Sequence, residues 1–370
     1  MRARPPPSQE TPVHVPSLPE CVDTELLVPL VRAETCLPQA EIADWRSHTV
    51  DDGTVGDIYV LEGTAQHSPS DARVTEWSLV LKVQRQWARP GDPECWRREF
   101  LMYDSGLLAD VADALAVPRL VQADTRDDEI WLWMEHVHGV TGGDMATDHY
   151  RHAAADLGRM QGPYLAGREL PAYAWLSSRR WASTAVGLWG TPAYHGLWRN
   201  GEGEEAATGL PRDLSRDTLR LWERRNVLLD AVDALPRTLC HRDYHADNVF
   251  VRPDVANGPT TIALDWDCAG IGTIAEDIGD MVAEALVYFS FPTEDADDLA
   301  GAALEAYASG LREAGWTGDA ALVRKAFATI MPTQWSLRVA RLAQIDDIAL
   351  MPRYIAVLRY LLALAAEACA

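Results

Sequence analysis

Short runs rich in apolar residues, separated by polar turns, recur in the first third of the chain. After a short helix expected at 21–35, these runs predict strands at 41–50, 58–65, 78–83, 119–123 and 130–135, with a polar loop at 67–76. Apolar residues at helical spacing predict one inserted helix over 94–108. We therefore expect a five-stranded, mostly antiparallel sheet that carries one helix.

Beyond residue 143 the apolar positions recur at helical spacing, so the rest of the chain is predicted to be mainly helical. The exception is a pair of short apolar β-type runs, 238–250 and 261–265, around a turn containing Pro253, Asn257 and Gly258, which predicts one embedded hairpin. The expected fold class is α+β, with a small antiparallel sheet lobe at 21–136 and a larger helical lobe at 137–370. Residues 1–20 are proline-rich and lack the apolar core of a signal peptide, so they predict a flexible arm.

Composition excludes several classes of protein. The chain of 370 residues is 48% hydrophobic and 24% charged, which is ordinary for a globular protein. We find no apolar run that approaches the roughly 18–20 residues needed to span a bilayer. The six cysteines form no CxxC pair and are expected to be reduced thiols in a cytoplasmic protein.

The net charge of −22 argues against nucleic-acid and membrane partners, because an acidic surface repels phosphate backbones and anionic lipids. The acidity has two interpretations: it serves solubility, or it attracts a cationic small molecule.

Two polar stretches carry the candidate chemistry. HRDYHADN places His241, Asp243 and Asn248 in an H-x-D-x-x-x-x-N pattern, and LDWD places Asp265 at the end of the next predicted strand. Phosphoryl transfer needs one carboxylate to orient the acceptor hydroxyl and hard oxygen ligands for Mg²⁺. Asp243 suits the first role, and Asn248 and Asp265 suit the second. The alternative is a polar turn whose side chains only cap the backbone.

A lysine in a predicted apolar strand fits the same chemistry. Only two of the 33 basic residues are lysines, and one of them, Lys82, lies inside SLVLKV, where its charge needs a partner. Glu99 on the following helix is the candidate partner, and a kinase uses such a pair to hold phosphate oxygens. Gly53 and Gly56 lie in the first turn, where bare backbone could approach phosphates, although an ordinary hairpin turn would look the same.

With these residues, the chain resembles the aminoglycoside phosphotransferase and choline kinase family, which has a bilobal, protein-kinase-like fold. The resemblance rests on Lys82, Glu99, HRDYHADN, LDWD and the small-residue stretch 270–282. It implies an ATP- or GTP-dependent phosphotransferase that uses Mg²⁺. It also implies that Glu135 and Val137 offer backbone hydrogen bonds to the purine, and that Asp277 caps a helix or orients the catalytic loop.

The segment 165–235 is the expected acceptor side, because helical insertions build the acceptor site in the family it resembles. Its aromatic side chains would suit a cationic or aromatic acceptor, or they pack a core. The acid-rich segment 276–298 lines the acceptor side or is a solvated helical face. The tryptophans concerned are Trp175, Trp181, Trp189, Trp198 and Trp222.

Several positions depart from the family pattern and leave the substrate open. Arg242 replaces a frequent glycine, and Ala246-Asp247 replaces a frequent Pro-Gly. His241 is expected to be structural, whereas the contributions of His245 and Asp267 stay open. The expected acceptor is a small molecule with a hydroxyl group, such as an antibiotic or secondary metabolite. The alternatives are a Ser/Thr kinase acting on a peptide in natural-product maturation and a nucleotide-binding partner without turnover.

Overall fold

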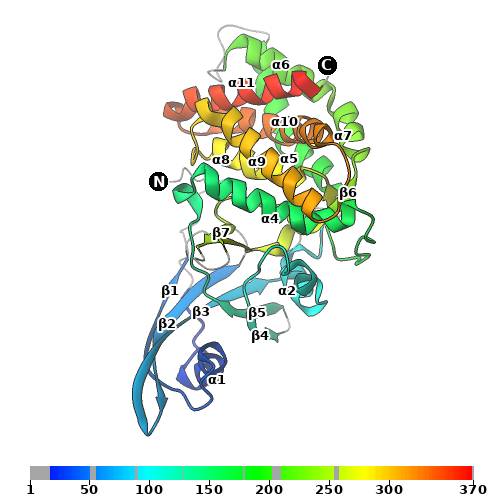
Figure 1. The fold of residues 1–370 in the computed structure, drawn as a ribbon. Coiled ribbons are helices and arrows are strands. Elements are labelled where there is room, and N and C mark those ends of the chain that lie inside the picture. The colour runs from blue at the N-terminus through cyan, green and yellow to red at the C-terminus, as the bar shows by residue number, and fades with distance from the viewer. Residues whose placement is uncertain are drawn as a thin grey trace.

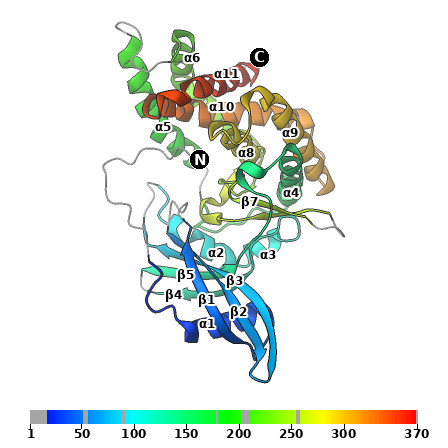
Figure 2. The same cartoon turned by 90° about the vertical axis from the view of Figure 1, so that its left-hand side faces the viewer.

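The computed structural model consists of a sheet lobe and a helical lobe (Figures 1 and 2). It describes residues 17–50, 56–87, 91–126, 128–177, 180–201, 210–253 and 258–368. The expected α+β bilobal architecture is confirmed. Most of the predicted arm at 1–20 lies outside the described residues.

The sheet lobe has five antiparallel strands in the order β1-β2-β3-β5-β4. Its apolar face, which includes Leu61, Leu81 and Trp133, is buried. In Figure 2, helix α1 lies beside this sheet. The elements are α1 (Thr24–Thr35), β1 (Glu41–Thr49), β2 (Asp57–Ser68), β3 (Asp71–Arg85), β4 (Leu120–Thr125) and β5 (Glu129–Glu135).

Two local predictions in this lobe were wrong. The stretch 67–76 is not a loop, because β2 and β3 continue through it and His67 Nε2 lies 2.7 Å from Thr75 Oγ1 across the pair. Its side chains are polar because this hairpin is largely exposed to solvent. The single helix expected at 94–108 is two helices, α2 (Arg98–Asp104) and α3 (Leu107–Val111). Gly106 lies between them with φ of 76°, a left-handed conformation that interrupts the helix. A 3₁₀ turn, Cys95–Arg97, precedes α2.

The helical lobe contains one large buried core that joins its long helices. These helices are α4 (Thr147–Leu165), α5 (Arg180–Gly201), α6 (Arg212–Glu223), α7 (Arg225–Asp233), α8 (Glu276–Val287), α9 (Ala296–Glu313), α10 (Ala320–Ile345) and α11 (Met351–Ala368). Short 3₁₀ turns lie at Gly142–Asp144, Trp266–Cys268, Thr293–Asp295 and Ile348–Leu350.

Four short strands are embedded among these helices and form two separate antiparallel pairs, β6-β9 and β7-β8. The pair β7-β8 is the predicted hairpin. The run 238–250 is not one strand, because a loop separates β6 from β7, and β9 was missed because GIGT offers little apolar patterning. The strands are β6 (Arg237–Cys240), β7 (Val249–Arg252), β8 (Thr260–Ala263) and β9 (Gly270–Thr273).

The segment Ile348–Glu367, mostly α11, is long and apolar enough to cross a membrane by length and composition alone. The expectation that no stretch approaches this length was therefore too strict. The finding is weak evidence for a span, because core helices pass the same test. Here α11 packs against α10 and buries Tyr354, Val357, Leu358 and Leu361.

Helices α4 and α9 pack closely because small residues meet at their crossing. A Cβ atom on Gly158 would overlap the carbonyl oxygen of Tyr307, and one on Gly310 would overlap that of Ala155. Both overlaps are with backbone, which cannot move aside as a side chain does. Gly301 on α9, by contrast, faces open space.

We expect Gly158→Ala to lower the free energy of unfolding by about 1–3 kcal/mol, because the added methyl group forces the two helices apart. The control Gly301→Ala should leave stability unchanged or raise it by up to about 1 kcal/mol, because alanine is the better helix former. Urea unfolding measures both, and equal midpoints for the two variants would contradict the packing described.

Candidate active site

The β7-β8 hairpin brings Asn248 and Asp265 together. Val249 pairs with Ala263, so Asn248 directly precedes one strand and Leu264 directly follows the other. The backbone N–H of Leu264 donates to the carbonyl oxygen of Asn248 at 2.8 Å. Asp265 then takes a left-handed conformation, with φ of 61°, before the turn Trp266–Cys268. Two oxygen-bearing side chains distant in sequence thus lie at one end of one hairpin.

Lys82 on β3 reaches this point from the sheet lobe. Its ammonium nitrogen lies 2.7 Å from Glu99 Oε2 on α2 and 2.7 Å from Asp265 Oδ1. The lysine is 5% exposed. Burial alone would lower the pKa of Lys82, but the carboxylates of Asp265 and Glu99 outweigh that effect and hold it above its usual value. The predicted Lys82–Glu99 pair therefore exists, and it extends across to the helical lobe.

Asp243 lies beside Asn248 in the loop between β6 and β7. The amide nitrogen of Asn248 donates to Asp243 Oδ2 at 2.8 Å and to the Asp243 carbonyl at 3.0 Å. These bonds orient the amide so that its oxygen points away from Asp243. Burial raises the pKa of Asp243, but hydrogen bonding and charge from His245 outweigh it and lower the pKa below its ordinary value.

A buried carboxylate, that of Asp277, binds the backbone of the loop that carries Asp243. Asp277, in the first turn of α8, accepts hydrogen bonds from the backbone N–H of His241 at 2.9 Å and of Arg242 at 2.7 Å. Gln161 on α4 donates to it at 2.7 Å. Burial raises the pKa of Asp277 to about 7. Asp277 holds the loop backbone and does not face Asn248 or Asp265, which agrees with the positioning role expected of it.

His241 is completely buried and hydrogen-bonds within the chain. Its Nε2 lies 2.9 Å from the Leu264 carbonyl, and its Nδ1 accepts from the backbone N–H of Asp243 at 3.3 Å. The ring therefore connects the Asp243 loop to the strand end that carries Asp265. Burial lowers the pKa of His241 to about 4, so the ring is neutral at physiological pH.

Arg242, which departs from the family pattern, has a structural role. Its backbone is left-handed, with φ of 66°. Its buried guanidinium donates to Glu276 Oε1 at 3.1 Å, to Ser177 Oγ at 2.9 Å and to the Ile271 carbonyl at 2.9 Å. These contacts explain how a long charged side chain occupies a position where relatives often have glycine.

A second buried arginine was missed by the sequence reasoning. Arg98 on α2 is 0% exposed, donates to the Trp175 carbonyl at 2.8 Å, and also contacts the Asp267 carbonyl and the Asp92 carboxylate. It therefore ties the helix that carries Glu99 to the turn that follows Asp265. From the sequence RREF, Arg98 would be expected to be an ordinary surface charge, because its partners are distant along the chain.

The other predicted nucleotide-binding residues are less informative. Gly53 lies outside the described residues. Gly56 has φ of 94°, and a Cβ atom there would lie 2.5 Å from the Val83 carbonyl, so the fold itself requires glycine. The Glu135 N–H donates to the Arg119 carbonyl at 2.9 Å. Val137 is buried just beyond β5.

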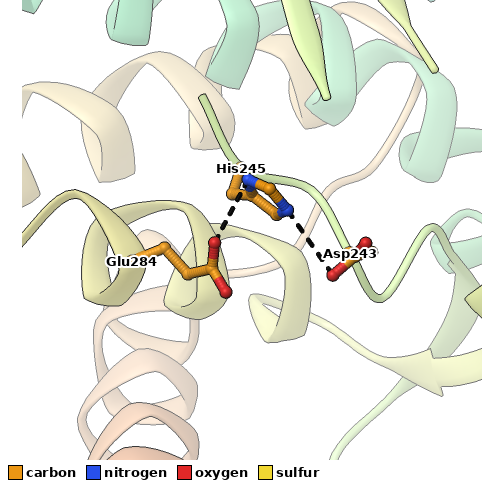
Figure 3. A group of neighbouring side chains, drawn as sticks. All are labelled: Asp243, His245 and Glu284. Atoms are coloured by element: carbon orange, nitrogen blue, oxygen red, sulfur yellow. Dashed lines mark ion pairs between the residues drawn. The ribbon is translucent and has the colours of Figure 1, made fainter. Parts of the chain in front are cut away.

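A cavity of about 410 Å³ adjoins the Asp243 loop. It is bounded by the loop, the end of α8 and the start of α11. His245 lines the cavity, and its ring also lies between Glu284 and Asp243 (Figure 3). The ring therefore connects the cavity wall to Asp243. The lining residues are Gly143, His245, Ala246, Asp247, Glu284, Ala285, Tyr288, Phe289, Ser290, Leu350 and Arg353.

The expected tryptophan walls do not line this cavity as far as the structure describes them. Trp175 stacks on Tyr173, and Trp222 stacks on Tyr194. Trp189 packs near Arg338. The side chains of Trp181 and Trp198 lie outside the described residues. Tyr288 and Phe289 supply the aromatic surface instead.

The acid-rich segment 276–298 is divided between buried and exposed residues. Glu276 and Asp277 are buried beneath the loop, and Glu284 faces the cavity. The later acidic residues, including Asp297 and Asp298, are exposed to solvent. Helix α8 is buried along nearly its whole length, and among its residues only Asp280 and Glu284 are partly exposed.

The chain belongs to the phosphotransferase enzyme family, whose model matches residues 74–322. This match confirms the resemblance based on Lys82, HRDYHADN and LDWD. No curated protein sequence matches the chain significantly.

Solved structures with the same fold include three small-molecule kinases. An aminoglycoside phosphotransferase from Alicyclobacillus acidocaldarius is 13% identical, with a TM-score of 0.53 and coverage of 87% of this chain and 92% of that one. An amicoumacin kinase, solved with AMP-PNP and Ca²⁺, is 16% identical, with a TM-score of 0.51 and coverage of 90% and 95%. A choline kinase from Cryptosporidium parvum is 13% identical, with a TM-score of 0.51 and coverage of 93% and 96%. At these identities the likeness establishes the fold.

The neutral, buried state of His241 predicts a pH dependence of stability. In the unfolded chain His241 binds a proton below about pH 6.5, whereas in the folded protein it does so only near pH 4. At this side chain the unfolded state therefore binds more protons in this interval, so the contribution of His241 to stability falls as the pH falls from about 6.5 to about 4.

We expect His241→Gln to flatten this decline by up to about 1.4 kcal/mol per pH unit, because glutamine does not titrate. Urea unfolding of both proteins at a series of pH values measures the difference. Parallel curves for wild type and variant between pH 4 and 6.5 would show that His241 does not titrate as its burial requires.

Proposed function

We propose that this protein transfers the γ-phosphate of ATP or GTP to a hydroxyl group of a small molecule. The observation that carries the proposal is the position of Asp265, which contacts Lys82 from the opposite lobe at 2.7 Å and adjoins Asn248 and Asp243 through the hairpin. An ammonium group, two candidate metal ligands and a carboxylate in one place are what phosphoryl transfer requires.

Asp243 is the residue that would orient the acceptor hydroxyl. Its pKa is below the ordinary value, so it is ionised at physiological pH and accepts a hydrogen bond from the hydroxyl. Asn248 holds the Asp243 carboxylate by donating to its Oδ2 atom. The other carboxylate oxygen, Oδ1, lies 3.6 Å from His245 Nε2, and it is the oxygen that would accept from the hydroxyl.

The donor atoms fit a divalent cation. The Asn248 amide presents its oxygen away from Asp243, and Lys82 uses Asp265 Oδ1, which leaves Oδ2. These are the hard oxygen ligands that Mg²⁺ prefers. When bound, Mg²⁺ would neutralise charge on the phosphates, while Lys82, fixed by Glu99, would bind phosphate oxygens.

Purine binding is proposed at the connection after β5. The carbonyl of Glu135 and the backbone of Val137 are the groups we expect to contact the base, and the turn containing Gly53 and Gly56 is expected to cover the phosphates. The amicoumacin kinase of the same fold was solved with AMP-PNP, which supports nucleotide binding at this fold without identifying the base used here.

The cavity beside His245 is the proposed acceptor site. Its walls combine the carboxylate of Asp247 with the rings of Tyr288 and Phe289, a combination that suits a cationic acceptor with an apolar body. No disulfide joins any of the five cysteines that the structure describes, Cys21, Cys36, Cys95, Cys240 and Cys268, which supports a cytoplasmic location.

Replacing Asp243 by Asn should reduce phosphate transfer by about 10²- to 10⁴-fold, because the amide cannot orient or deprotonate the hydroxyl as the carboxylate does. Nucleotide affinity should stay near that of the wild type. The assay uses γ-labelled ATP with a panel of hydroxylated amines, from amino alcohols to aminoglycosides, and mass spectrometry of the products. A fully active Asp243→Asn protein would rule out the mechanism.

Filling the cavity should block the acceptor but not the nucleotide. We expect Leu350→Trp to abolish transfer to whichever panel compound the wild type phosphorylates, while ATP hydrolysis to water continues. Ile348→Trp is the matched control, because Ile348 lies in the same turn but is 78% exposed. Equal transfer by the two variants would place the acceptor elsewhere.

A further inference from the structure

Arg338, on α10, is held in an aromatic box. The carbon of its guanidinium lies 4.3 Å from the ring centre of Trp335, 5.1 Å from Trp189 on α5 and 5.7 Å from Tyr288. Its Nη2 atom donates to the Tyr288 hydroxyl at 2.5 Å. Cation–π contacts on three sides and this hydrogen bond fix the position of the guanidinium.

Glu284, on α8, is held between two groups of the chain. Its Oε1 atom lies 4.0 Å from Arg338 Nη1, and its Oε2 atom lies 3.1 Å from His245 Nδ1. Its side chain is mostly buried, at 14% exposure. Because both carboxylate oxygens face side chains of the protein, Glu284 is better placed to organise the site than to bind an acceptor.

His245 lies between Glu284 and Asp243. Figure 3 shows the imidazole between Glu284 and Asp243, with one ring nitrogen directed at each carboxylate. His245 Nε2 lies 3.6 Å from Asp243 Oδ1 and 3.1 Å from Asn248 Nδ2. The ring therefore contacts the side of Asp243 that Asn248 does not hold.

We propose that Arg338 and Glu284 are positioning residues that fix the carboxylate of Asp243 through His245. We call the contacts from Arg338 through Glu284 and His245 to Asp243 the bridge. The role given to Asp243 rests on the proposed function, whereas the bridge itself rests on the contacts above. The bridge connects the aromatic box, carried by α5, α10 and the residue after α8, to the loop that carries Asp243. Substitutions in these helices can therefore change turnover without touching nucleotide or acceptor.

Hydrolysis of ATP to water tests the proposal without an identified acceptor. Glu284→Leu removes the carboxylate that lies 3.1 Å from His245 Nδ1, and it leaves Asp247 Oδ2 at 3.7 Å from the same nitrogen. It should lower kcat for hydrolysis by about 10- to 100-fold, with KM for ATP unchanged, because Asp243 is displaced and the nucleotide-binding groups are not. Glu284→Gln keeps an oxygen opposite His245 Nδ1 and should retain most of the rate. The control Glu305→Leu removes a carboxylate that is 82% exposed on α9 and should match the wild type.

Coupling between the two positioning residues is the second part of this test. If Arg338 acts through Glu284, the double variant Arg338→Met/Glu284→Leu should be no slower than Glu284→Leu alone. Three results would overturn the proposal: unchanged hydrolysis in Glu284→Leu, equal rates for the Gln and Leu variants, or additive effects in the double variant. The first would leave Glu284 as an acceptor-binding residue, and the second as a packing residue.

¹⁵N NMR of the His245 imidazole detects its contact with Glu284 without a turnover assay. The His245 signals, identified by their loss in His245→Asn, should shift in Glu284→Leu and shift little in Glu284→Gln. If the wild type neither hydrolyses ATP nor transfers phosphate, and these shifts are still observed, the proposed function is wrong and the bridge is confirmed. If the His245 signals are the same in wild type and Glu284→Leu, the bridge does not exist.

Discussion

The rest of the site depends on the charge of one buried lysine. An ammonium group removed from water is costly unless opposite charges surround it. Lys82 meets this requirement with two carboxylates, and they come from different lobes: Glu99 from α2 and Asp265 from the end of the β7-β8 hairpin. The lobes are therefore held at a spacing that keeps both carboxylates within 2.7 Å of the same nitrogen.

Each of these carboxylates is held in turn by buried polar contacts. Gln84 donates to Glu99 Oε2 at 3.2 Å, and Arg98 binds the carbonyl of Asp267, two residues beyond Asp265. On the opposite side Asp277 binds the backbone of the Asp243 loop. These buried contacts favour one arrangement of the reacting groups, although Gln84 Oε1 is buried without a hydrogen-bond partner among the described residues. The long helices supply the apolar core that encloses it.

Features that depend on local pattern could be read from the sequence. The strands of the sheet lobe follow from their apolar runs and the polar turns between them, and residue type and spacing identify Lys82, Asp243, Asn248 and Asp265 as candidates. Features that depend on contacts distant in sequence could not. Arg98 and Glu284 look like surface charges until the fold brings Asp267 and His245 to them. The end of the β2-β3 hairpin, 67–76, looks like a loop because solvent reaches it.

A crystal structure with AMP-PNP and Mn²⁺, using the anomalous signal of manganese, tests the central claim most directly. The account predicts a manganese peak coordinated by the Asn248 amide oxygen and Asp265 Oδ2. It also predicts phosphate oxygens on Lys82 and the γ-phosphate facing Asp243. A nucleotide bound elsewhere, or a metal bound without Asn248 and Asp265, would contradict it.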